Sequence, residues 1–123
     1  MIRVAIVEDD AVVRRSLSRI VDDARGMRCV AACTTGEEAL KLLPDSQPAV
    51  VVMDINLPQM SGIECVRRLR DQLPDTQVLM LTVYEDSESI FRALRAGASG
   101  YLLKRCEPDQ LLEAIRDILH GGG

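Results

Sequence analysis

The sequence predicts an α/β fold: a five-stranded parallel sheet in the order 2-1-3-4-5, doubly wound, with helices on both faces. Five short apolar segments alternate with five segments whose apolar residues recur at helical spacing. Such alternation favours right-handed crossovers and therefore parallel strands. The segment 50–54 (VVVMD) is apolar and rich in β-branched residues, which is typical of a strand buried on both faces. A length of 123 residues is that of one domain with a single core.

The first half of the chain supplies three strands and two helices. Residues 2–7 form the first predicted strand, and Asp9 or Asp10 can cap the helix that follows and is closed by Gly26. Residues 27–33 form the second strand. Thr35 and Glu38 have the spacing of a capping box for a short helix that runs to Pro44. The third strand is expected at 49–54.

The second half continues the same alternation. Ser61 and Gly62 open a third helix that ends before Pro74, and residues 77–82 form a fourth strand. The fourth helix follows Ser87 and is closed by Gly97. Its inward residues are expected to be Ile90, Ala93 and Leu94. The fifth strand is 99–103, and a fifth helix begins with Pro108 at its first position and stops at Gly121.

Composition excludes several kinds of function. A net charge of −4 and an aromatic content of 2% argue against direct binding of DNA or of single-stranded nucleic acid by this chain. The first apolar run stops at Glu8, so no signal peptide or membrane segment is recognised, and a cytoplasmic location is expected. The four cysteines are interpreted as small buried hydrophobes. A zinc site has little support because the single histidine, His120, lies in the tail.

Polar residues stand where four of the five predicted strands end. Glu8 and Asp9 follow the first strand, Asp54 ends the third, Thr82 ends the fourth and Lys104 follows the fifth. Because the carboxyl ends of parallel strands share one edge of the sheet, these side chains are expected to converge at the switch point between strands one and three. The pattern therefore predicts a functional site at this edge.

Three carboxylates gathered without a cation repel one another, so the cluster favours a divalent metal. Mg²⁺ is the best fit, because it binds through one or two carboxylates and completes its shell with water, carbonyl or phosphate oxygens. Asp54 could then accept a phosphoryl group, with Lys104 as a second positive charge and Thr82 as a hydroxyl donor. Each residue taken alone has a simpler interpretation, such as a helix cap for Asp9 or a solvated cation for Lys104.

At this point the chain resembles a known family, the receiver domain of bacterial two-component response regulators. The resemblance covers residues 2–119 and implies a flavodoxin-like (βα)5 topology. It is carried by the acidic pair Glu8 and Asp9, by the segment 54–58 (DINLP) with Gly62, by Leu81 and Thr82, and by the segment 97–104 (GASGYLLK). The region 93–104 is most similar to the NarL/FixJ subfamily, which usually carries a LuxR-type helix-turn-helix. Residues 1–119 are then the receiver, and 120–123 begin a linker to an absent DNA-binding domain.

The resemblance implies a phosphorylation-activated switch with a set of assigned residues. Asp54 would take a phosphoryl group from a sensor histidine kinase or a small phosphodonor, and no further enzymatic activity is expected beyond slow autodephosphorylation. The implied roles are Mg²⁺ binding by Asp9, Asp54, the Asn56 carbonyl and, through water, Glu8; phosphoryl contacts by Thr82 and Lys104; switching by Thr82 and Tyr101; and tuning of phosphate lifetime by Asn56 and Tyr84. Homodimerisation on phosphorylation is a further expectation.

Two departures from the family pattern lead to expectations of their own. Lys104 is followed by Arg105 where many receivers have a proline after a cis bond, so a trans bond is expected here. Val12, Leu112 and Leu119 lie off the main apolar faces of their helices. They indicate either a surface for a dimer or output domain, or simply scattered exposed apolar residues.

Three other functions are compatible with parts of the pattern. A haloacid-dehalogenase-like phosphatase also phosphorylates an aspartate at a strand end, but it needs a second aspartate where this chain has Asn56. A flavodoxin-like FMN carrier would need a phosphate-binding loop after the first strand, and no such loop is present. A receiver that acts as a phosphorylation-independent interaction module remains an alternative, although the intact acidic set argues against it.

Overall fold

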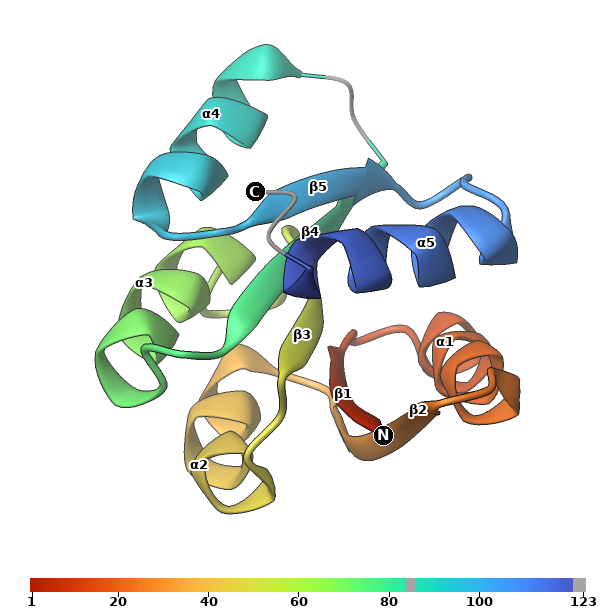
Figure 1. Ribbon diagram of the computed structural model, residues 1–123. Coiled ribbons are helices and arrows are strands. Elements are labelled where there is room, and N and C mark those ends of the chain that lie inside the picture. The colour runs from red at the N-terminus through yellow and green to blue at the C-terminus, as the bar shows by residue number, and fades with distance from the viewer. Residues whose placement is uncertain (84–85, 121–123) are drawn as a thin grey trace.

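A computed structural model describes residues 1–83 and 86–120 and contains the predicted five-stranded parallel sheet in the order β2-β1-β3-β4-β5. Helices α1 and α5 cover one face of the sheet, and α2, α3 and α4 cover the other (Figure 1). The strands are β1 (Ile2–Val7), β2 (Met27–Cys33), β3 (Val50–Asp54), β4 (Gln77–Thr82) and β5 (Gly100–Leu103). The helices are α1 (Ala11–Asp23), α2 (Gly36–Ser46), α3 (Gly62–Gln72), α4 (Ser87–Ala96) and α5 (Pro108–Leu119).

The core has two layers because successive residues of each central strand point to opposite faces of the sheet. Val51 and Met53 of β3 pack beneath α2 and α3, whereas Val50 and Val52 pack beneath α1 and α5. All four are fully buried. Asp54 follows this run as the last residue of β3, so the strand that anchors the core also fixes the position of the carboxylate.

The helix starts follow the capping signals in the sequence. Of the two candidate caps for α1, Asp10 is the one that accepts from the backbone N–H groups of Val12 and Val13, at 2.9 and 3.1 Å. Thr35 caps α2 and Ser61 caps α3, each by accepting from a backbone N–H three residues ahead. Pro108 is the first residue of α5, as predicted. Short polar side chains therefore satisfy backbone donors that a helix start leaves unpaired.

Several predicted boundaries were wrong by a few residues. Helix α1 ends at Asp23, and Gly26 lies beyond it in the turn with φ +82°. Helix α2 continues through Pro44 to Ser46, because Leu43 is fully buried and Gln47, in the left-handed region, closes the helix by donating to the Leu43 carbonyl. Strands β3 and β5 each begin one residue later than expected.

The prediction that Leu94 points inward was wrong. Its side chain is 41% exposed, and Ala93 is the buried residue of α4. Among the residues proposed as surplus apolar positions, Val12 is exposed, whereas Leu112 and Leu119 are half-buried and pack against the layer beneath α1 and α5. The four cysteines are free thiols, and Cys33 and Cys65 are fully buried. Within the described residues, none of the helices has the length and apolar character needed to cross a membrane.

Candidate functional site

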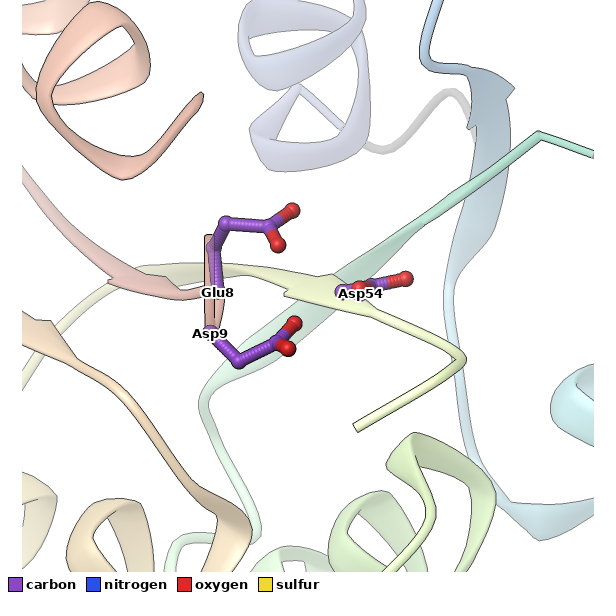
Figure 2. A group of neighbouring side chains, drawn as sticks. All are labelled: Glu8, Asp9 and Asp54. Carbon is purple, nitrogen blue, oxygen red and sulfur yellow. The ribbon is translucent and has the colours of Figure 1, made fainter. Parts of the chain in front are cut away.

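The predicted acidic residues converge at the carboxyl edge of the sheet. Glu8 follows β1 and is 1% exposed, Asp54 ends β3 and is 3% exposed, and Asp9 lies on the surface beside them. One carboxylate oxygen from each of the three lies within 4.8 Å of the others. Figure 2 shows the Glu8 and Asp9 side chains extending toward the side on which Asp54 lies. Residues far apart in the sequence thus form one negatively charged cluster, as the strand order requires.

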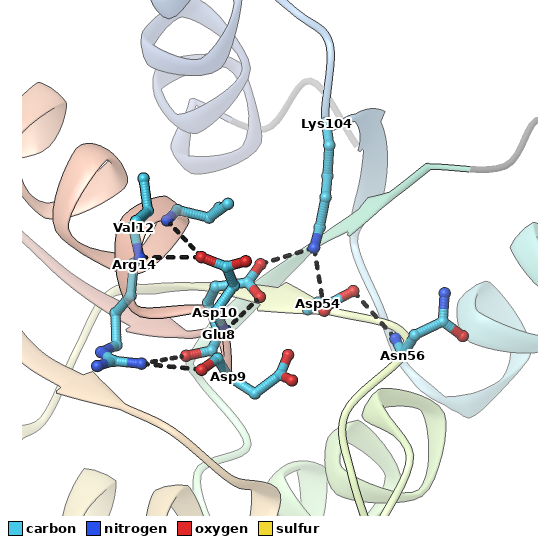
Figure 3. Close-up of polar contacts among 9 residues, drawn as sticks. Glu8, Asp9, Asp10, Val12, Arg14, Asp54, Asn56 and Lys104 are labelled. Atoms are coloured by element: carbon cyan, nitrogen blue, oxygen red, sulfur yellow. Dashed lines mark hydrogen bonds and ion pairs between the residues drawn. The ribbon is translucent and has the colours of Figure 1, made fainter.

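Both carboxylate oxygens of Asp54 are engaged. Oδ1 accepts a hydrogen bond from the backbone N–H of Asn56 at 3.0 Å, and Oδ2 lies 3.1 Å from Nζ of Lys104 (Figure 3). The chain beyond Asp54 is also held, because the Ile55 N–H donates to the Leu81 carbonyl at 3.0 Å. The carboxylate is therefore fixed in direction by its own turn and by the neighbouring strand.

Glycine at position 62 permits the close approach of α3 to this turn. A Cβ atom there would overlap the carbonyl oxygen of Asp54 and would lie 2.9 Å from Cα of Ile55. The Gly62 N–H also donates to the Ile55 carbonyl at 2.8 Å. The sequence signal at Gly62 thus corresponds to a steric requirement of the Asp54 backbone.

Lys104 bridges two buried carboxylates. Its Nζ lies 2.7 Å from Oε1 of Glu8 and 3.1 Å from Oδ2 of Asp54. Burial alone would lower the pKa of Lys104, but the contacts with Glu8 and Asp54 outweigh burial and raise that pKa. Lys104 therefore stays cationic and partly neutralises the cluster.

Glu8 is the most strongly constrained member of the cluster. Its Oε2 accepts from the Asp10 backbone N–H at 3.1 Å, and its own N–H donates to the Cys33 carbonyl at 2.9 Å. Burial, assisted by the charge of Asp54, raises the pKa of Glu8 despite the ion pair with Lys104. Lys104 therefore offsets only part of the free-energy cost of keeping Glu8 ionised. A further cation at the cluster would offset more of it.

Two of the remaining predicted residues, Thr82 and Asn56, lie at the rim of the same edge. Thr82 is 1% exposed at the end of β4, and its carbonyl accepts from the Lys104 N–H at 2.8 Å. Asn56 is exposed beside Asp54. Tyr101 on β5 has its side chain 45% exposed, and Tyr84 lies outside the described residues. The described part of the chain contains no cis peptide, so the Lys104–Arg105 bond is trans, as predicted.

Arg14 is a residue near the site that the sequence interpretation missed. Its Nη1 donates to the backbone carbonyl of Glu8 at 3.0 Å and to that of Asp9 at 3.3 Å (Figure 3). Arg14 lies one turn into α1, four residues after the Asp10 cap, and that closeness to the acidic pair is the only signal the sequence offers. An arginine at this position is otherwise read as an exposed helix residue.

The donor chemistry of the cluster fits a hard divalent cation. Among the described residues, the cluster offers oxygen ligands, from three carboxylates with one lysine between two of them. Glu8 Oε1 is buried with an ion-pair contact but no well-aligned hydrogen bond. Mg²⁺ prefers such oxygen ligands and retains water in the remaining positions. A carboxylate held beside a bound cation and a lysine is also arranged to attack an incoming phosphoryl group.

Comparisons with known proteins identify the family of this chain. A family model described as the response regulator receiver domain matches residues 4–116. DegU of Brevibacillus brevis, a transcriptional regulatory protein, is 36% identical over 98% of this chain and 51% of its own length. NreC of Staphylococcus haemolyticus, an oxygen regulatory protein, is 37% identical over 97% of this chain and 55% of its own length. The chain thus spans about half the length of these curated relatives.

Solved structures agree with the sequence comparisons. The signal receiver domain of the response regulator NarL from Mycobacterium tuberculosis superposes with a TM-score of 0.92 at 27% identity, covering 98% of this chain and 97% of that one. A LuxR-family response regulator from Aurantimonas sp. has a TM-score of 0.92 at 35% identity, covering 97% and 85% of the two chains. Receiver domains are signalling proteins that bind Mg²⁺ at an acidic pocket, and the relatives are regulators rather than enzymes. The chain belongs to the response regulator receiver family, in its NarL/FixJ-type branch.

Proposed function

We propose that this receiver is switched by phosphorylation of Asp54 in a Mg²⁺-dependent reaction. The observation that carries the proposal is the setting of the Asp54 carboxylate: it is buried, oriented by Asn56, bridged to Lys104, and within 4.8 Å of oxygens from Glu8 and Asp9. Few structural roles require a carboxylate to be held in this way at the edge of a sheet. The family makes such a switch the expected function.

The proposed transfer assigns a task to each residue. An Asp54 carboxylate oxygen forms a bond to phosphorus while the bond from phosphorus to the donor breaks, and its electron pair leaves with the imidazole or carboxylate of the donor. Lys104 and the Thr82 hydroxyl would contact the transferred oxygens. Asp9, Asp54, the Asn56 carbonyl and, through water, Glu8 would hold Mg²⁺. The bound ion supplies positive charge opposite the developing negative charge.

The switch itself would involve Thr82 and Tyr101. Thr82 is proposed to move toward the phosphoryl group, and Tyr101, which is half exposed on β5, would turn inward behind it. The face formed by α4, β5 and α5 would change shape as a result. Asn56 and Tyr84 are proposed to set the lifetime of the aspartyl phosphate, Tyr84 by limiting the access of water.

Partners follow from the family and from the length of its members. We propose a sensor histidine kinase as phosphodonor, a homodimer as a product of phosphorylation, and the cytoplasm as the place of action. Residues 1–119 would be the receiver and 120–123 the start of a linker. DNA binding would reside in a C-terminal helix-turn-helix domain outside the 123 residues of this chain.

The test is phosphorylation by acetyl phosphate with Mg²⁺, followed by intact mass measurement. The wild-type chain should gain the mass of one phosphoryl group, and Asp54→Asn should not. Asp71→Asn, which alters an exposed aspartate of α3, is the control and should label normally. Omitting Mg²⁺ should reduce labelling, and sedimentation of the same samples reports dimerisation. Equal labelling of Asp54→Asn would refute the proposal, and an unlabelled wild type would favour the phosphorylation-independent interaction module.

A further inference from the structure

Arg14 joins α1 to the backbone of the two residues that begin the acidic cluster. Its guanidinium donates from Nη1 to the carbonyls of Glu8 and Asp9, at 3.0 and 3.3 Å. Its own backbone N–H donates to the Asp10 carbonyl at 2.8 Å. In the described part of the chain, no backbone N–H donates to the Glu8 or Asp9 carbonyl. The arginine therefore supplies the hydrogen bonds that these carbonyls would otherwise take from water.

The Asp9 carboxylate depends on its backbone for its position. Among the described residues, no hydrogen bond or ion pair holds this exposed side chain, in contrast to those of Glu8 and Asp54. The Asp9 carbonyl is turned toward Arg14, while its carboxylate is directed toward the cluster (Figures 2 and 3). A contact that fixes the peptide orientation at 8–9 thus also fixes the direction in which the Asp9 side chain leaves the backbone.

We propose that Arg14 is a positioning residue for the divalent cation site, acting through the backbone of Glu8 and Asp9. This inference rests on the proposed Mg²⁺ site. Arginine suits the task because one nitrogen of its planar guanidinium carries two N–H groups, enough for both carbonyls. The guanidinium also remains charged at every accessible pH. Groups that orient metal ligands without touching the metal typically change its affinity 10–100-fold when they are removed.

The positive charge of Arg14 acts in the opposite direction on Mg²⁺ affinity. The direction of the change in affinity on removal of Arg14 therefore tests the proposal. A cation near the cluster repels Mg²⁺, so removal of the charge alone would tighten Mg²⁺ binding. Loss of positioning would weaken it. Positioning is the larger of the two effects. The weakening therefore persists at high ionic strength, where charge repulsion is screened.

The test uses the full chain and three variants: Arg14→Met, Arg14→Lys and Arg15→Met. Arg15 is the matched control, because it is the next residue of α1, is exposed and, among the described residues, donates no hydrogen bond to the 8–9 backbone. Mg²⁺ affinity is measured from the amide NMR shifts of Asp9 and Asn56 at two ionic strengths. Thermal unfolding without Mg²⁺ is measured separately, so that a general loss of stability is recognised.

Arg14→Met should weaken Mg²⁺ binding about tenfold. Arg14→Lys should weaken it at least as much, since lysine keeps the repulsive charge but carries its donors on a shorter, flexible stem without the planar guanidinium. Arg15→Met should stay near the wild-type affinity. Unchanged or tighter binding by Arg14→Met overturns the inference, while normal wild-type titration leaves the proposed Mg²⁺ site standing. If the wild type shows no saturable shift, both fail. If Arg14→Met does not fold, Arg14→Lys alone decides between the outcomes.

Discussion

Lys104 lies between two buried carboxylates, and its positive charge offsets the cost of burying them when no metal is bound. The chain has a second lysine, Lys41, which is exposed on α2 and makes no ion pair in the described part of the molecule. The two lysines allow removal of a buried and an exposed positive charge to be compared in the same protein. Breaking a buried pair is costly because the surviving charge stays desolvated.

Replacement of Lys104 by methionine should lower the free energy of unfolding by roughly 3 kcal/mol at neutral pH without divalent ions. Lys41→Met should change it by less than about 0.5 kcal/mol. Mg²⁺ should restore part of the loss in Lys104→Met, because it supplies positive charge to the same oxygens. Urea unfolding of both variants with and without Mg²⁺ measures this. Similar losses for the two variants would contradict the assigned role of Lys104.

The raised pKa of Glu8 predicts a dependence of stability on pH. A group whose pKa is raised in the folded state contributes stability that is complete below its unfolded pKa, about 4.3 for glutamate. That stability is lost as pH rises through the folded pKa. Without metal, the free energy of unfolding of Glu8→Gln should therefore rise relative to that of the wild type as pH increases from about 4 to neutrality. Urea unfolding across this range tests it, with the exposed Glu113→Gln as control. A wild type whose stability relative to Glu8→Gln does not fall as pH rises over this range would be inconsistent with the shift.

The residues of the cluster could be predicted, and the contact from Arg14 could not. Glu8, Asp9, Asp54, Thr82 and Lys104 each stand where a strand ends, so the strand order alone brings them together. Arg14 acts through a long side chain that reaches back over the helix start to two carbonyls. Sequence spacing does not fix where a flexible side chain of this kind ends.

At the scale of elements, the contact between α3 and the turn after Asp54 depends on the missing side chain at Gly62. A methyl group there should cost about 1–3 kcal/mol through overpacking, because its neighbours are backbone atoms that cannot move aside. Gly62→Ala should also slow phosphorylation by acetyl phosphate, since relief of the overlap shifts the Asp54 backbone. Chemical unfolding and time-resolved intact mass measure the two effects.

Gly100→Ala is the matched control for this prediction. A Cβ atom at Gly100 would meet only the side-chain ends of Ile118 and Leu79, both at 3.7 Å, which is ordinary contact. The substitution should change stability little and leave the phosphorylation rate unchanged. Equal behaviour of the two variants would show that the closeness of α3 to Asp54 is unimportant for the acceptor.

The types of all ten elements were predicted from apolar spacing and caps, while errors arose where tertiary packing overrode a local signal. Pro44 indicates a helix end, yet burial of Leu43 carries α2 onward to Ser46. Leu94 fits the apolar pattern of α4, yet the contact of this helix with the core is limited to its narrow Ala93 side. Local patterns specify that a helix forms, but its length and rotation depend on the surface it meets.

At the scale of the whole molecule, the two core layers place the four thiols in different environments. Cys33 and Cys65 are fully buried in the layer beneath α2 and α3, whereas Cys29 and Cys106 are half-buried at the border of the other layer. Burial raises the pKa of Cys33 to about 11 and that of Cys65 to about 12. The reactive thiolate is therefore rare at these two positions near neutral pH, in addition to being inaccessible.

Native-state alkylation should therefore report the opening of one core layer. With iodoacetamide at pH 8, Cys29 and Cys106 should react first. Cys33 and Cys65 should react only when the α2–α3 layer separates from the sheet, so that this opening sets their rate. Because both buried thiols belong to one cluster, their rates should be similar and should rise in parallel with urea. Peptide mass spectrometry after timed quenching measures each site, and fully unfolded protein, in which all four react alike, gives the reference rates. Fast reaction of Cys65 while Cys33 remains protected would mean that α3 opens independently. The turn after Asp54, which packs against Gly62 of α3, would then lack the rigid support on which oriented phosphoryl transfer depends.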